Sequence, residues 1–180
     1  MNPLHIVVLD RDTLVNRPFD FDFPHTLSSY GTTEAHETLE RIRGADIVIT
    51  NKVVISAQSF AENPQLKLVA VTATGVNNVD VEAAKQNGTA VCNIRAYGNE
   101  SVAEHAFMMM ITLMRNLPAY QRDVAAGLWE NSPFFCHLGA PMRDLNSKTL
   151  AIFGRGNIGK TLATYAQAFK MNVVFAEHKN

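Results

Sequence analysis

The sequence predicts an α/β protein built on parallel sheets, and three observations lead to this prediction. Short runs rich in Val and Ile alternate with segments of helical pattern, as expected of strands that are buried on both faces of a sheet. Strand, helix and strand follow one another in the order of βαβ units. A glycine-rich turn near residue 154 separates one such strand from a helix. With 180 residues, 47% of them hydrophobic, the chain can bury a substantial core.

The elements can be assigned in chain order. The apolar runs predict strands over residues 4–9, 46–50, 66–71, 90–93, 149–153 and 172–176. The intervening segments predict helices over residues 33–43, 79–86, 101–117 and 157–169. Thr33 is a candidate N-cap of the first helix, with Gly44 at its end, and Asn87-Gly88 ends the second.

The third predicted helix and the segment after it differ from the rest. The helix is almost entirely apolar, which predicts burial on most of its sides. Residues 118–148 have a weaker pattern, with the only tryptophan, Trp129, and the pair Phe134-Phe135, and are interpreted as an arm or connector. A shift of pattern near residues 97–101 predicts two domains, residues 1–99 and residues 100–180.

Composition and charge exclude several classes of protein. Lys and Arg number 16 against 17 Asp and Glu, so no strong field would attract nucleic acid or anionic lipid. The most apolar stretch, residues 106–114, is too short to cross a bilayer, which takes about 20 residues. Cys92 and Cys136 are too few and too far apart for a disulfide scaffold or a thiolate metal site. A signal peptide is not recognisable at the amino terminus, so we expect a cytoplasmic protein. From the charge balance, the short apolar stretch and the two cysteines we also expect no nucleic-acid, membrane or metal partner.

The run Gly154-Arg155-Gly156-Asn157-Ile158-Gly159 matches the pattern G-x-G-x-x-G. Its place between a predicted strand and helix makes it a predicted dinucleotide site: the first glycine permits the turn, the second admits a pyrophosphate, and the third lets helix and strand pack closely. The helix amino terminus would attract the phosphates, Arg155 could add a cation, and Asn157 and Ile158 would offer backbone contacts.

The acidic residue Glu177 follows Gly159 by 18 residues, at the end of the next predicted strand. An acid there accepts hydrogen bonds from the ribose of the cofactor, which favours NAD over NADP. The neighbouring His178 and Lys179 leave NADP open, because a cation can receive a 2′-phosphate. The alternative for the whole motif is a glycine-rich turn followed by a solvated glutamate.

Further motifs resemble the D-isomer-specific 2-hydroxyacid dehydrogenases, and within that family the glycerate dehydrogenases, also called hydroxypyruvate reductases. The resemblance extends over the chain and rests on residues 72–80 (TATGVNNVD), 101–105 (SVAEH), 115–117 (RNL), 127–129 (GLW), 50–52 (TNK), 93–98 (NIRAYG) and 175–179 (FAEHK). It implies a flavodoxin-like substrate domain and a Rossmann-type NAD-binding domain, both incomplete in this chain.

The resemblance also implies site residues. Backbone N–H groups of Thr74, Gly75 and Val76 would bind the substrate carboxylate, as amides at strand ends can; a plain strand-to-helix turn is the alternative. Asn51 and Lys52 would lie at a similar strand end, where the Lys52 ammonium could orient an anionic substrate. A solvated surface lysine is an equally expected alternative. Val102 would contact the cofactor, and Ser101 would either contact it or cap its helix.

The family's catalytic arginine, glutamate and histidine would lie beyond Asn180, so we expect no catalytic residue in this chain, which resembles a fragment that is inactive alone. The parent activity would be hydride transfer between NAD(H) and a small 2-hydroxy or 2-keto acid, such as reduction of hydroxypyruvate or glyoxylate. Phosphoglycerate, lactate, formate and phosphite remain alternative substrates, and a non-catalytic NAD-binding or interaction module is the alternative function. The resemblance also implies a homodimer, with residues 118–148 as its arm.

Overall fold

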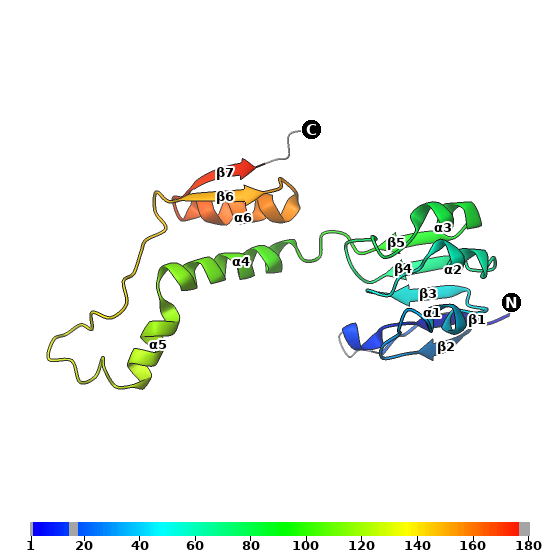
Figure 1. Ribbon diagram of the computed structural model, residues 1–180, viewed down its shortest axis with the longest axis horizontal. Helices are drawn as coiled ribbons and strands as arrows, with labels where there is room; N and C mark the ends of the chain where they lie inside the picture. The colour runs from blue at the N-terminus through cyan, green and yellow to red at the C-terminus, as the bar shows by residue number, and fades with distance from the viewer. Residues whose placement is uncertain (1, 15–17, 177–180) are drawn as a thin grey trace. The chain divides into compact units, whose positions relative to one another are not determined.

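The computed structural model describes residues 2–14 and 18–176 of the chain (Figure 1). The chain divides into two compact units, Met1–Arg95 and Ala96–Asn180. Each unit has its own parallel sheet, so the predicted α/β class is confirmed.

The first unit is built around a five-stranded parallel sheet (Figure 1). Its strands are β1 (Leu4–Val8), β2 (His25–Ser29), β3 (Ile47–Thr50), β4 (Leu68–Val71) and β5 (Ala90–Asn93). They lie in the order β2-β1-β3-β4-β5, which is the flavodoxin-like order. In this order β3 is central and β1 lies between β2 and β3, and because all five strands are parallel their carboxyl ends meet at one edge of the sheet.

Strand β2 was not predicted, because its sequence contains a single large apolar residue, Leu27, which is partly exposed. It lies at the edge of the sheet and pairs only with β1, where His25 is opposite Leu4. An edge strand buries too little surface to impose an apolar pattern.

Short helices connect these strands: η1 (Arg11–Thr13), α1 (Thr38–Arg41), α2 (Ala57–Ala61) and α3 (Val81–Asn87). The prediction of Thr33 as an N-cap is wrong, since α1 begins five residues later and the Thr33 hydroxyl donates to the Leu9 carbonyl. In α3 the Asp80 carboxylate accepts from the Ala83 amide at 2.9 Å. Gly88 follows that helix with a φ of 75°, a conformation that favours glycine.

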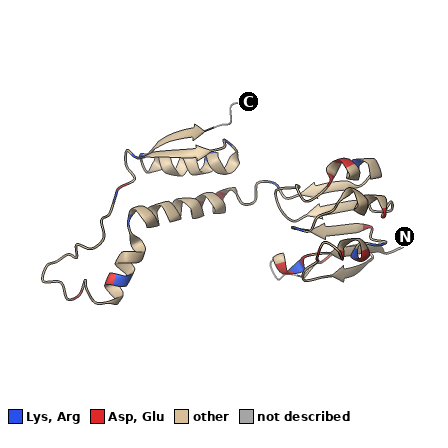
Figure 2. Ribbon diagram, in the orientation of Figure 1, with Lys and Arg blue, Asp and Glu red and all other residues tan. Residues whose placement is uncertain are grey.

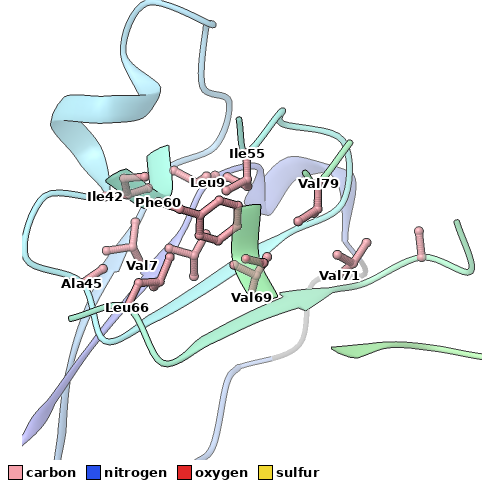
Figure 3. Packing of buried hydrophobic residues seen from close by; sticks show 13 residues of the cluster. Val7, Leu9, Ile42, Ala45, Ile55, Phe60, Leu66, Val69, Val71 and Val79 are labelled. Carbon is pink, nitrogen blue, oxygen red and sulfur yellow. The ribbon is translucent and has the colours of Figure 1, made fainter. Parts of the chain in front are cut away.

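Two apolar clusters hold the sheet. The larger one packs Phe60 of α2 against β1, β3 and β4 residues such as Val7 and Val69, as Figure 3 shows. The smaller one covers Ile6, Val8 and Ile49 with the side chains of Phe19, Phe21 and Phe23. A segment without regular secondary structure therefore covers part of this sheet with its aromatic side chains.

The second unit contains α4 (Asn99–Met114), α5 (Leu117–Ala125), β6 (Thr149–Phe153), α6 (Asn157–Ala168) and β7 (Asn172–Ala176). Strands β6 and β7 are parallel and are joined through α6, which makes one βαβ unit. Helix α4 packs against α6 through Phe107, whose ring lies 4.8 Å from that of Phe169.

The prediction that the long apolar helix is buried on most sides is wrong for this chain. Only Ala103 and Phe107 of α4 are buried, whereas Met108, Met109 and Leu113 are exposed. The helix also ends at Met114, and the predicted arm begins with the separate helix α5. The residues that follow α5 fold back on this helix, since His137 Nε2 lies 2.8 Å from a carboxylate oxygen of Asp123.

Positive and negative residues are interspersed, and the strands β3, β4 and β5 carry no charge (Figure 2). Within residues 2–14 and 18–176, no helix is both long enough and apolar enough to cross a membrane.

Candidate functional site

The first candidate site is the turn between β6 and α6 in the second unit. Gly154 directly follows β6 and has a φ of 95°, in the region that L side chains rarely adopt. Its amide donates to the carbonyl of Ala176 at 3.1 Å, which continues the pairing of β6 with β7. The chain can therefore leave the sheet and turn directly into α6 at this residue.

The other two glycines of the motif differ in their surroundings. Gly156 is the N-cap of α6, and a Cβ atom there would meet nothing within 4 Å. A Cβ atom on Gly159 would lie 2.6 Å from the Gly154 carbonyl oxygen and 3.2 Å from Cγ2 of Ile152. Gly159 is thus required by the close approach of α6 to β6, whereas Gly156 leaves its backbone open to an approaching group.

The first turn of α6 presents backbone N–H groups without partners inside the helix. The amide of Lys160 donates to the Gly156 carbonyl at 3.0 Å, so the amides of Asn157, Ile158 and Gly159 precede the first helical bond. Asn157 and Ile158 are exposed. With the partial positive charge at the start of a 12-residue helix, this turn can bind an anion such as a pyrophosphate.

The Arg155 side chain lies beside this turn. Its guanidinium carbon is 5.2 Å from the centre of the Phe175 ring on β7. The face of an aromatic ring attracts a cation, so this contact favours the position of the guanidinium beside the turn. Arg155 is exposed and so could also reach a phosphate. Glu177, the predicted ribose acid, lies outside the described residues.

Val102 lies in the first turn of α4 and is about half exposed. Ser101 does not cap this helix, because α4 begins at Asn99 and the Ser101 hydroxyl donates to the Gly98 carbonyl from inside the first turn. The same turn is tied to α6, since the Tyr165 hydroxyl donates to the Glu100 carboxylate. That hydrogen bond raises the pKa of Tyr165 to about 12.

The second candidate site is formed by the carboxyl ends of the strands in the first unit. The predicted substrate residues Thr74 and Gly75 follow β4 and are exposed, while Val76 packs partly against the core. A Cβ atom on Gly75 would meet nothing within 4 Å, so the backbone here is accessible. Asn93, at the end of β5, donates its side-chain amide to the Thr74 carbonyl at 2.6 Å.

The loop after β3 contains the predicted residues Asn51 and Lys52. The carboxylate of Asp10, which follows β1, accepts from both backbone amides, at 2.9 Å for Asn51 and 2.6 Å for Lys52. Asn78 donates its side-chain amide to the Val53 carbonyl at 3.0 Å. Hydrogen bonds therefore connect the loops after β1, β3, β4 and β5, and the exposed Lys52 adds the positive charge.

The structure brings Asn51 and Lys52 together with residues 74–76 at the strand ends of the first unit, and it places residues 154–159 in one turn of the second unit. Val102 lies on another element, α4, whose first turn contacts α6 through Tyr165. Sequence reasoning missed Asp10, Asn78 and Asn93, which hold the loops of the first unit. Asp10 could have been found from its place directly after a buried strand, where parallel α/β proteins bind ligands. Among the residues that the structure describes, no three His, Cys, Asp or Glu side chains gather as metal ligands.

Known proteins are similar to this chain in sequence and in fold. Residues 10–178 match the family model described as D-isomer specific 2-hydroxyacid dehydrogenase, catalytic domain. A glycerate dehydrogenase of Methylorubrum extorquens is 40% identical over 170 residues, which cover 94% of this chain and 54% of the relative. A hydroxypyruvate reductase of Blautia hydrogenotrophica is 36% identical over 149 residues, which cover 82% of this chain and 46% of the relative. The chain thus spans about half the length of the curated relatives it matches.

A solved structure agrees on the fold. The 2-hydroxyacid dehydrogenase of Ketogulonicigenium vulgare superposes with a TM-score of 0.75 at 19% identity, and the match covers 97% of this chain and 54% of that one. At this identity the likeness concerns the fold alone, and it agrees with the α/β units described above.

Proposed function

Because this chain belongs to the D-isomer specific 2-hydroxyacid dehydrogenase family, we propose that it is part of an NAD-dependent enzyme acting on a small 2-hydroxy or 2-keto acid. The preferred pair is hydroxypyruvate and D-glycerate, with glyoxylate as a related substrate. The names of the relatives from Methylorubrum extorquens and Blautia hydrogenotrophica support this choice. Residues 1–99 would bind the acid and residues 100–180 the cofactor.

The observation that carries the proposal is the geometry of the β6–α6 turn. Gly159 is fixed by packing, and Gly156 is open on the side where a ligand can approach. The free amides of the first turn of α6 would hold the pyrophosphate, Arg155 would add a cation, and Val102 would contact the cofactor. NAD would supply the hydride acceptor. The acidic Glu177 supports NAD rather than NADP.

In the first unit, the proposed role of the strand-end loops is to bind and orient the acid. The amides of Thr74, Gly75 and Val76 would donate to the substrate carboxylate, because glycine leaves such donors accessible. Asn51 would add a polar contact, and the ammonium of Lys52 would attract the anion. A carboxylate held by several amides is fixed in orientation, which hydride transfer requires.

We propose that the 180-residue chain alone binds ligands without turnover. Reduction of a 2-keto acid needs a cation to polarise the carbonyl and an acid near neutral pKa to protonate the new alkoxide. Within the described part of the chain, the histidines His5, His25, His36, His105 and His137 all lie outside the turn after β6 and the loops after β3 and β4. The family's arginine, glutamate and histidine would complete the site.

We also propose a homodimer in the cytoplasm, with residues 118–148 as the dimer arm. The arm exposes large apolar side chains, and Phe135 is 97% and Leu138 91% accessible. Such surface favours burial against a partner.

Three measurements on the 180-residue chain test the proposal: an NADH fluorescence titration, a D-glycerate titration followed by amide NMR shifts, and an assay of NADH consumption with hydroxypyruvate. We expect saturable NADH binding, binding of D-glycerate, and no NADH consumption. Failure to bind NADH would contradict the proposed cofactor site. Turnover would contradict the proposal that the 180-residue chain binds ligands without catalysing the reaction. NADH binding without any binding of 2-hydroxy acids would support the non-catalytic module instead.

A further inference from the structure

The carboxylate of Asp10 is buried beneath the loop that follows β3. The residue is 4% exposed and comes two residues after the end of β1, which pairs with β3 in the sheet. Its oxygens accept from three successive backbone amides, at 2.9 Å for Asn51, 2.6 Å for Lys52 and 3.3 Å for Val53. Burying a carboxylate is unfavourable unless it is hydrogen-bonded, so the loop and the carboxylate stabilise one another.

The chemistry of this contact requires a carboxylate. An ionised Asp is an acceptor only, with room for several donors, whereas an Asn of the same shape would turn an NH₂ group toward the amides. The Thr50 hydroxyl supports the same arrangement, since it lies 3.4 Å from Asp10 Oδ2 and accepts from the Val53 amide at 3.0 Å. Strand β3 ends at Thr50, so these bonds determine the backbone beyond the sheet rather than the sheet itself.

We propose that Asp10 is a positioning residue for the acid-binding loops, which it serves by fixing the backbone of Asn51 and Lys52. The inference rests on the proposed function, because it assigns these loops to the substrate. Fixing the Lys52 backbone limits the positions that its exposed ammonium can reach. The Val53 carbonyl, on the same loop, accepts from Asn78 at 3.0 Å, so the constraint extends to the loop after β4.

The test compares Asp10→Asn with Thr89→Val in the 180-residue chain. Thr89 is also buried, and its hydroxyl donates to the Leu66 carbonyl at 2.7 Å near the amino-terminal ends of β4 and β5. Thr89→Val therefore removes a buried hydrogen bond from the same sheet at its opposite edge. Binding of D-glycerate is followed by amide NMR shifts, NADH binding by fluorescence, and stability by chemical denaturation.

We expect Asp10→Asn to weaken D-glycerate binding by roughly tenfold and to shift the Asn51, Lys52 and Val53 amides, because the loop loses its acceptor. Thr89→Val should keep the D-glycerate affinity of the original chain, and both variants should keep its NADH affinity. If Asp10→Asn does not fold, Thr50→Val decides, with an expected loss of about threefold from the removal of one loop contact.

Two results would overturn the inference. One is unchanged D-glycerate affinity in a folded Asp10→Asn chain, or in folded Thr50→Val where that variant decides. The other is an equal loss in Thr89→Val, which would indicate a general effect of stability. A chain with its original sequence that binds no D-glycerate would contradict the proposed function first, and would remove the role of the loop with it.

Discussion

A Cβ atom on Gly159 would lie 2.6 Å from the carbonyl oxygen of Gly154, closer than real Cβ atoms come to another atom. The obstacle is backbone, which cannot move away as the end of a flexible side chain can. Gly156 belongs to the same motif, yet the space around its missing Cβ is empty. One glycine is therefore required by packing within the chain, and the other is not.

Replacement of Gly159 by Ala should destabilise the second unit. The added methyl group forces α6 away from β6, and overpacking of this kind costs about 1–3 kcal/mol in the free energy of unfolding. Denaturant unfolding followed by circular dichroism measures the change. An unchanged unfolding midpoint would show that α6 and β6 approach less closely than described.

Gly156→Ala should leave the fold intact and weaken the cofactor site. Gly156 has a φ of −75°, which alanine adopts readily, so the free energy of unfolding should change by less than about 1 kcal/mol. The methyl group would occupy the space proposed for the pyrophosphate, and we expect NADH affinity to fall by about tenfold or more. Unchanged NADH affinity in this variant would argue against a phosphate at this position.

Asp46 should make the first unit sensitive to acid. The pKa of its carboxyl is lowered from 3.8, first by the hydrogen bond from Lys67 and then by that from the His5 amide. A lowered pKa in the folded state stabilises the fold above pH 3.8, and this contribution disappears as the pH falls through the folded value. The stability difference between the original chain and Asp46→Asn should therefore shrink below pH 3.8.

Denaturant unfolding of both chains as a function of pH measures that difference. Lys67→Met provides the control, because it removes the main cause of the shift and should return the pKa of Asp46 toward 3.8. A constant difference between the original chain and Asp46→Asn down to pH 2 would contradict the prediction.

Removal of the exposed phenylalanines of the arm should weaken self-association. Phe134 and Phe135 are 72% and 97% accessible, so the double replacement by Ser removes few contacts within the chain. Sedimentation velocity over a range of concentrations should show dimer dissociation increased by about tenfold or more. Phe153→Ser is the matched control, since Phe153 is 87% exposed on β6, outside the arm. If only Phe153→Ser increased dissociation, the dimer contact would lie on the sheet rather than on the arm.

The sequence predicted the elements whose burial leaves a pattern. Strands β1, β3 and β4 are short and mainly apolar because both of their faces are covered, and the β6–α6 turn carries its glycines where the backbone needs them. Helix α2 escaped prediction because five residues are too few to show a helical period.

What the sequence could not supply were contacts between distant residues. The bond between Asp10 and the Lys52 amide joins positions 42 residues apart, and no local pattern records it. For helix α4 the apolar sequence predicted burial on most sides, whereas Met108 and Leu113 are exposed in this chain. An apolar sequence indicates that a surface favours burial without indicating what covers it.

An NMR titration of the 180-residue chain with NADH tests most directly whether the β6–α6 turn binds the cofactor. We expect saturable shifts in the amides of Gly156, Asn157, Ile158 and Gly159, with the loops around Lys52 and Gly75 responding to D-glycerate instead. Saturating NADH that leaves the amides of the β6–α6 turn unshifted would contradict the proposed cofactor site.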